Sequence, residues 1–521
     1  MRASVLISSA AIAAASIAAQ AQRAGGTPQT VAPFDVTEAS IAQIHAAMTA
    51  KRLTCRVLVT AYQARIAAHD KEGAALNAIT QLNDAALTEA DALDRRFASG
   101  GLTGPLHCIP MIVKDNFETI GLQSAAGSLA LQGFVSDKDA FQVARIKAAG
   151  AIVLAKSNMA EWAFSPLETV NSLLPGYTRN PYATDRVTAG SSGGTAAAVA
   201  ASFGAAGLGS DTGNSIRGPS AHQALVGIRS TMGLTSRAGV VPLNLLADIA
   251  GPMARTVADA VAVFQVIVGE DPDDPVTAAS RGRTIPAYAD SLKPDGLKGA
   301  RIGVLRQAFE RGGVDPDVTA VFTAALASLE RAGAIIVDPA PIELTNVRRA
   351  QGSGSCGGFK YDITQWFARH AGKTPVSSLS EVIKSRKFHP SIQSRLESAE
   401  QSTPAEPGSP ACLAEAEYRK AYGAAVTARM DELKLDAYVY PTWSYPPRLI
   451  GDLNTPAGDN SQVFSPTSGF PSISVPMGYT RNNRLPAGIT FFGRAWDEAT
   501  LIRLAFGYEQ ATKHRRAPVL R

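Results

Sequence analysis

The stretch RVTAGSSGGTAAAVAASFGAAGLGSDTGNSIRGP, residues 186–219, carries two serine-bearing glycine clusters joined by an alanine-rich segment. Glycine adopts backbone conformations closed to other residues and lets two backbones approach closely, which suits tight turns that present a hydroxyl. The joining segment predicts a short buried helix over Ala196–Phe203 and a strand over Ala206–Gly209. This connection would bring the second cluster, Gly213-Asn214-Ser215, back beside the first.

Three interpretations of this stretch compete. A Gly/Ser-rich linker is disfavoured because the stretch lies deep in an apolar chain. A phosphate cradle is disfavoured because neither G-x-x-x-x-G-K-[ST] nor a clear G-x-G-x-x-G opening a helix is present. The third is a nucleophile turn: residues 190–194 fit G-x-S-x-G, with Ser192 as the nucleophile of an α/β-hydrolase. Such an enzyme needs a histidine that follows the serine in the chain. The candidates are His222, His370, His389 and His514, and the sequence around none of them indicates a catalytic role.

A lysine offers a different base. Residues 106–115 read LHCIPMIVKD, and the apolar run Ile109–Val113 predicts a strand. Lys114 stands at its C-terminal end, where α/β enzymes place their chemistry. Apolar surroundings would desolvate its amine and lower its pKa. The competing interpretation is a solvated lysine at a strand end.

Taken together, the motifs resemble those of the amidase-signature family, hydrolases with a Ser–cis-Ser–Lys triad. The matching segments are VKDN (113–116), GAIVLAKSNMAEWA (150–163), AGSSGGTAAAVAA (189–201), GSDTGNSIRGPS (209–220), GPMARTVADA (251–260), SGFPSISVPMGY (468–479), LPAGITFFGR (485–494) and EQATKHRRAP (509–518). Ser191 and Ser215 meet the family's spacing of 24 positions between its two active serines. Residues from about 300 to 435 match poorly, and substrate choice is expected to vary there.

The resemblance implies an α/β fold, the amidase-signature fold, in which a large mixed sheet of about eleven strands is covered by helices on both faces. It also implies a triad in which Ser215 is the nucleophile, Ser191 bridges from a cis peptide, and Lys114 is the base. The oxyanion hole would be made by backbone N–H groups around Thr212, Gly213, Asn214 and Ser215. From strand–helix alternation alone, we expect a largely parallel sheet.

Three neighbouring residues have roles that the sequence leaves open. Ser192 is either a supporting hydrogen-bond residue or purely structural. Arg217 either binds a substrate carboxylate or, the favoured choice, forms a structural ion pair with Asp211. Asn214 stands where the family usually has glycine, and its side chain could narrow the pocket or donate a hydrogen bond.

The N-terminus predicts export. Residues 1–21 carry a positive start, a short apolar run over Val5–Ala19, and an A-x-A cleavage site at Ala19-Gln20-Ala21. The apolar run of about 15 residues is shorter than the ~20 needed to span a bilayer, which favours a cleaved signal peptide over an anchor. Residues 22–34 then form an N-terminal segment, and residues 35–521 a single domain. We expect a periplasmic or secreted enzyme with no membrane span after cleavage.

Composition and charge limit the classes of function that the chain can have. Apolar residues make up 45% of the 521 positions and charged residues 18%, which indicates a globular chain with a large core. A net charge of +5 with scattered basic residues does not predict nucleic-acid binding. The family's transamidosome subunits act on charged tRNA beside partner subunits, and the predicted signal peptide argues against that role. No ligand cluster predicts a metal and no motif predicts a cofactor.

Cys55, Cys108, Cys356 and Cys412 are widely spaced, so one or two disulfides and buried free thiols are equally open. Cys108 is the best candidate for a buried, unpaired thiol.

The expected partner is a small-molecule amide substrate. The expected oligomeric state is a monomer or a homodimer. Aryl or alkyl amides are favoured because aromatic side chains are available for an apolar pocket: Trp162, Phe164, Tyr177, Trp443 and Tyr445. Esters and carbamates share the acyl chemistry. A non-catalytic binding protein with the same fold remains an alternative, because fold alone does not guarantee function. Intact Lys114, Ser191 and Ser215 argue against it.

Overall fold

The computed structural model describes residues 34–520 apart from 165–169, 311, 350–355 and 457. The predicted signal peptide and all but the last residue of the segment 22–34 lie outside this range. From Val36 onward the chain forms one compact unit. Within the described part of the chain, no helix has both the length and the apolar character needed to cross a membrane.

One eleven-stranded sheet organises this unit, in the order β1-β3-β2-β6-β8-β7-β12-β13-β11-β9-β10. Its strands are β1 (Ile79–Leu82), β2 (Pro110–Lys114), β3 (Ile152–Ser157), β6 (Ala206–Asp211), β7 (Val226–Arg229), β8 (Ile249–Ala254), β9 (Arg301–Val304), β10 (Ile335–Val337), β11 (Ala437–Pro441), β12 (Ser472–Thr480) and β13 (Leu485–Phe492). A separate two-stranded ladder joins β4 (Asn171–Ser172) to β5 (Gly176–Tyr177).

The sheet is mixed, as the family resemblance implied, and the expectation of a largely parallel sheet was wrong. Four neighbour pairs run parallel and six antiparallel. Strand–helix alternation accounts for the parallel pairs among β2, β3 and β6 and between β9 and β10, but it does not extend to the rest of the sheet. Further on, a four-residue turn over 481–484 joins β12 directly to β13, and such a short connection permits only antiparallel pairing.

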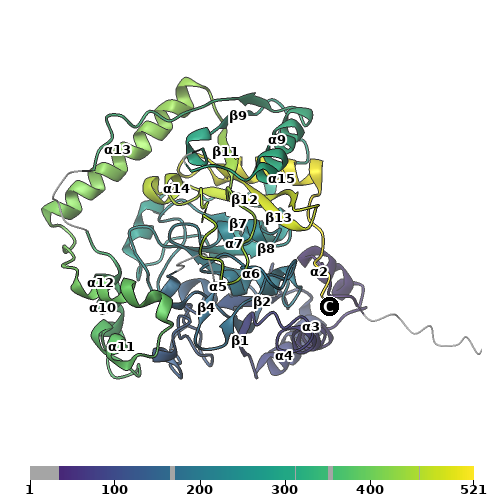
Figure 1. The fold of residues 1–521 in the computed structure, drawn as a ribbon. Helices are drawn as coiled ribbons and strands as arrows, with labels where there is room; N and C mark the ends of the chain where they lie inside the picture. The colour runs from purple at the N-terminus through teal and green to yellow at the C-terminus, as the bar shows by residue number, and fades with distance from the viewer. Residues whose placement is uncertain (1–33, 165–169, 311, 350–355, 457, 521) are drawn as a thin grey trace, which may run out of the picture. The chain divides into compact units, whose positions relative to one another are not determined.

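Helices surround this sheet, and Figure 1 shows the long α13 running along the outside of the body. They are α2 (Ile41–Thr49), α3 (Cys55–His69), α4 (Ala86–Gly100), α5 (Phe141–Ala148), α6 (Gly193–Ala200), α7 (Arg217–His222), α8 (Val257–Ile267), α9 (Pro316–Arg331), α10 (Phe359–Arg369), α11 (Leu379–Ser385), α12 (Gln393–Gln401), α13 (Pro410–Glu432), α14 (Phe464–Ser468) and α15 (Glu498–Thr512). One group, α5, α8 and α15, packs on β3, β8 and β12, and a second, α6 and α7, packs on β2, β6 and β13. Helices therefore cover both faces.

Glycines in two strands bring the second helix group close to the sheet. A Cβ atom added at Gly207 would lie 2.5 Å from Thr195 Cγ2 of α6, and one added at Gly488 would lie 2.6 Å from Ala221 Cβ of α7. Such distances exclude a side chain at either position. Close packing of α6 and α7 matters because each begins at a turn that carries one of the predicted active serines.

Parallel pairing of β2 with β6 places the functional residues at one end of the sheet. Met111 pairs with Ala206 and Val113 with Leu208, so both strands run toward the same edge. Lys114 is the last residue of β2, and the turn that carries Ser215 begins directly after β6. This is the carboxyl end of the parallel strands, where α/β folds commonly bind ligands.

All four cysteines are paired, and the expectation of an unpaired Cys108 was wrong. Cys55 and Cys108 form a disulfide with Cα atoms 5.5 Å apart, and Cys356 and Cys412 form a second with Cα atoms 4.6 Å apart. Cys108 is buried as expected, but the start of α3 packs beside the segment that leads into β2 and supplies Cys55 as its partner. Because Cys55 and Cys108 are 53 residues apart in sequence, the local sequence around either cysteine did not indicate that they pair.

Candidate active site

Lys114 is fully buried, and its amine contacts two serine hydroxyls. Nζ lies 2.7 Å from Ser191 Oγ and 2.8 Å from Ser210 Oγ. Burial lowers the pKa of Lys114 to about 7, although the negative charges of Asp211 and Asp248 act in the opposite direction. A substantial fraction of the amine is therefore neutral near pH 7, as a general base requires.

The first glycine cluster forms the turn that presents Ser191. The Gly190–Ser191 peptide bond is cis, as the family resemblance implied. The Ser191 carbonyl accepts a hydrogen bond from the Ala160 N–H at 3.1 Å. The Ser192 N–H donates to the Ser215 carbonyl at 3.2 Å, so the backbone joins this turn to the second one.

Ser192 supports the site rather than facing a histidine. Its hydroxyl donates to the Ser210 carbonyl at 3.1 Å and accepts from the Ser210 N–H at 3.3 Å. All seven histidines lie in the described part of the chain, and none of their ring nitrogens bonds to Ser192. The Ser192–His arrangement of an α/β-hydrolase is therefore not formed.

Ser215 stands on the second turn, between β6 and α7. Its Oγ donates a long hydrogen bond of 3.4 Å to Asn214 Oδ1, and the structure places no hydrogen bond between the hydroxyls of Ser215 and Ser191. In the described structure, the backbone N–H groups of residues 212–215 donate to no protein acceptor. Unpaired N–H groups beside a hydroxyl are what an oxyanion hole requires.

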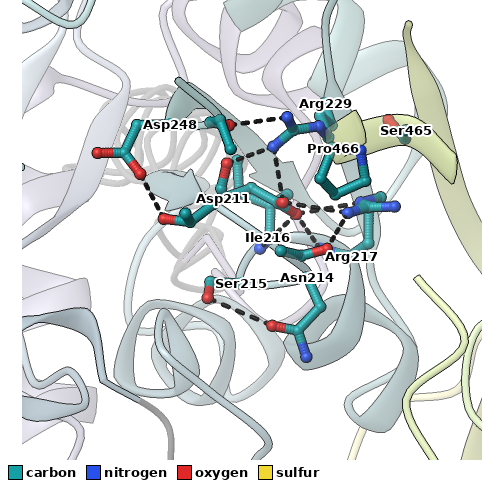
Figure 2. Close-up of polar contacts among 12 residues, drawn as sticks. Asp211, Asn214, Ser215, Ile216, Arg217, Arg229, Asp248, Ser465 and Pro466 are labelled. Carbon is teal, nitrogen blue, oxygen red and sulfur yellow. Dashed lines mark hydrogen bonds and ion pairs between the residues drawn. The ribbon is translucent and has the colours of Figure 1, made fainter. Parts of the chain in front are cut away.

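Asp211 anchors this turn through the contacts that Figure 2 shows. It forms buried ion pairs with Arg217, at 3.1 Å, and with Arg229, at 2.9 Å, and accepts the Ile216 N–H at 3.0 Å. The two guanidinium groups hold the pKa of Asp211 below its usual range despite its burial. Arg217 is thus occupied by the carboxylate that the sequence favoured and is not free for a substrate.

Arg229 was not assigned a role from sequence, although a charged residue closing the apolar strand β7 was an available signal. Burial lowers its pKa to about 10, and its guanidinium also donates to the Asp211 and Ala247 carbonyls.

Three more residues that sequence reasoning missed lie around the predicted triad. Ser210 contacts the Lys114 amine and accepts a hydrogen bond from Asn116 Nδ2 at 3.0 Å. Asp248 accepts the Thr212 hydroxyl at 2.5 Å. Asn116 and Ser210 lie inside quoted motifs, whereas nothing in the local sequence marks Asp248.

In the described structure the predicted aromatic residues are dispersed and do not line the pocket beside the turn. Trp162 and Phe164 belong to a buried apolar cluster with residues of α10, and Tyr177 is 41% exposed. Trp443, in contrast, packs against Ala189 and Ala221, next to both serine turns. This pocket is lined by the polar residues Asn116, Ser210 and Thr212, by the charged Arg237 and Asp248, and by apolar residues that include Ala163, Val241 and Leu243. Within the described residues, no group of three or more His, Cys, Asp or Glu side chains could hold a metal.

A protein-family model described as Amidase matches residues 57–502. The chain belongs to the amidase family. As a member, it is a hydrolase of the C–N bonds of carboxylic amides.

Individual relatives agree with this membership. Peptide amidase from Stenotrophomonas maltophilia is 37% identical in sequence, with a TM-score of 0.81 over 94% of this chain and 100% of that chain. An amidase family protein from Bacillus anthracis is 31% identical, with a TM-score of 0.82 over 93% of each chain. A glutamyl-tRNA(Gln) amidotransferase subunit from Thermosynechococcus vestitus is 34% identical over 92% of this chain and 99% of its own length.

Proposed function

We propose that this amidase-family chain hydrolyses small aryl or alkyl amides through an acyl-enzyme on Ser215, with Ser191 as the bridging serine and Lys114 as the base. The observation that carries this proposal is the fully buried Lys114 amine, 2.7 Å from the Ser191 hydroxyl. A serine hydroxyl is a weak nucleophile until a neighbouring group takes its proton. Here the available base is the Lys114 amine, whose pKa burial lowers to about 7.

The proton path follows from this geometry. Ser215 Oγ attacks the amide carbon, and its proton passes to Ser191 as the Ser191 proton passes to Lys114. The developing oxyanion accepts hydrogen bonds from the N–H groups of residues 212–215. The C–N bond then breaks as Ser191 protonates the leaving nitrogen and regains a proton from Lys114. Water, deprotonated along the same path, releases the carboxylic acid and restores Ser215.

Two features support an uncharged, partly apolar substrate. The pocket beside the turn combines polar groups near the reacting atoms with aliphatic walls. Arg217 and Arg229 are both paired with Asp211, and Arg237, which lines the pocket, is paired with Asp274, so none of the three offers an unpaired charge to a substrate carboxylate. Esters and carbamates with similar acyl groups could enter the same acylation chemistry.

Activity on tRNA is the second candidate, because the curated relatives include amidotransferase subunits. We favour a small-molecule amide, because the predicted signal peptide would export the chain away from charged tRNA. We also propose export to the periplasm or the medium and a monomeric or homodimeric state. Two disulfides support export, because such bonds persist in oxidising compartments.

Turnover of a panel of amides and esters by the purified chain, without partner subunits or tRNA, tests this function. A fluorophosphonate probe should label the wild-type enzyme, and mass spectrometry should locate the label on Ser215. A label on Ser192 would reject the assigned nucleophile. Absence of turnover on the whole panel, with release of ammonia from glutamine only beside added amidotransferase subunits, would favour the tRNA-linked function.

A further inference from the structure

Asn214 occupies the position where the family usually has glycine, and its carboxamide lies beside the reacting atom of the proposed mechanism. The Ser215 hydroxyl donates to Asn214 Oδ1 at 3.4 Å, as Figure 2 shows. This distance exceeds the 2.5–3.0 Å of an ordinary O–H···O bond, so the contact is weak and easily exchanged. When the hydroxyl turns toward Ser191 to react, Asn214 Oδ1 loses its donor.

The surroundings keep this carboxamide in place. Asn214 is 6% exposed, and its carbonyl accepts the Gly218 N–H at 2.7 Å. A Cβ atom added at Gly218 would lie 3.3 Å from Asn214 Nδ2 and 3.1 Å from Trp443 Cζ2. The amide therefore packs beside the Gly218 backbone, next to the Trp443 indole, with Oδ1 on the side of Ser215.

The chemistry of amide cleavage supplies a replacement donor. In the tetrahedral intermediate the leaving nitrogen is bonded to the same carbon as Ser215 Oγ, so its N–H lies within reach of an acceptor beside Oγ. That nitrogen must direct its lone pair at Ser191 to be protonated. An N–H donated to Asn214 Oδ1 would hold the lone pair in that direction. An ester or an N,N-disubstituted amide has no such N–H.

We propose, on the basis of the function given above, that Asn214 is a further catalytic residue whose carbonyl oxygen accepts a hydrogen bond from the leaving N–H and thereby favours primary and secondary amides. The bond forms after Ser215 attacks and is strongest as the C–N bond breaks. It should therefore act on kcat more than on KM, because it is made in the transition state and not in the ground state.

The test uses three substrates with one butyryl acyl group: the p-nitroanilide, the N-methyl-p-nitroanilide and the p-nitrophenyl ester. Asn214→Ala and Asn214→Gly should lower kcat for the anilide about tenfold, the equivalent of one hydrogen bond of about 1.4 kcal/mol. In both variants the ratios of anilide kcat to ester kcat and to N-methyl-anilide kcat should fall about tenfold, because a change in the oxyanion turn affects all three substrates while only the anilide carries the N–H. The ester and the N-methyl anilide report whether the fold and the triad remain intact.

Asn214→Asp keeps an acceptor oxygen and loses the amide donor, so at pH 9 it should retain more anilide activity than Asn214→Ala. Equal losses for all three substrates, no loss for any, or an Asp variant no better than the Ala variant would each overturn the proposal. Failure of the proposed function looks different: the wild-type enzyme would then turn over none of the three substrates and would not label at Ser215.

Discussion

Replacing Lys114 tests the base assignment through the pH dependence of the reaction. Burial lowers the pKa of this amine from 10.5 to about 7. At pH 7 about half of the amine is then neutral, against roughly one part in three thousand at the ordinary value. The lowered pKa thus raises the neutral fraction of the amine at pH 7 about a thousandfold. At about 1.4 kcal/mol per pKa unit, burial disfavours the charged amine by about 5 kcal/mol.

The assay is kcat/KM for a neutral amide between pH 5 and pH 10. We expect the wild-type profile to rise with an apparent pKa of about 7 and then to reach a plateau, because only neutral Lys114 can accept a proton. The residual activity of Lys114→Ala should lack this rise. Lys114→Arg should be nearly inactive at every pH, because a guanidinium does not give up its proton.

Histidine variants are the control, since an imidazole titrates in the same range. Replacing His222, His370, His389 and His514 one at a time should leave the rise in place. A rise near pH 6.5 that persists in Lys114→Ala and disappears on replacing one histidine would refute the lysine mechanism.

The same shift predicts the pH dependence of stability. Because the folded-state pKa of Lys114 lies below its unfolded value, the unfolded chain binds more protons between about pH 7 and pH 10. The free energy of unfolding of the wild type, relative to Lys114→Met, should therefore fall as pH decreases across this window and stay constant below it. Denaturant titrations at several pH values measure this difference, and a difference independent of pH would show that the amine is not buried.

Four further results are expected. Ser215→Ala should abolish fluorophosphonate labelling, whereas Ser191→Ala should label slowly because its nucleophile remains but its proton path is broken; equal labelling rates would contradict these roles. Chelators should leave turnover unchanged, and a loss restored by Zn²⁺ would contradict a metal-free triad. Replacing Cys55 and Cys108 with serine should lower the free energy of unfolding by about 4 kcal/mol, estimated from the chain entropy of the closed loop and measured by denaturant titration. Gly488→Val should lower the melting temperature markedly, because even a Cβ atom there would lie 2.6 Å from Ala221 Cβ, while an unchanged value would mean that α7 can shift.

Local sequence was sufficient wherever neighbours along the chain make the structure. Apolar runs predicted the strands β2 and β6, with boundaries within two residues of those observed. The tight glycine turns that present Ser191 and Ser215 were also visible, because glycine at these positions reflects a local steric need. The expected contact between Lys114 and Ser191 is present in the structure, whereas their catalytic roles remain a prediction.

The tertiary structure decided what depends on segments distant in sequence. The sheet is mixed because β8 runs antiparallel to β6 and β12 runs antiparallel to β13. The order of the strands is set by pairing between residues that are far apart in sequence. The Cys55–Cys108 disulfide, the Arg229–Asp211 ion pair and the Asp248–Thr212 hydrogen bond each join separate elements. Sequence by itself determined which hydroxyls and which amine this chain carries to its candidate active site. Only the fold determined that the amine is buried enough for its pKa to fall into the range of a general base, because burial is a property of the packed protein and not of any one segment.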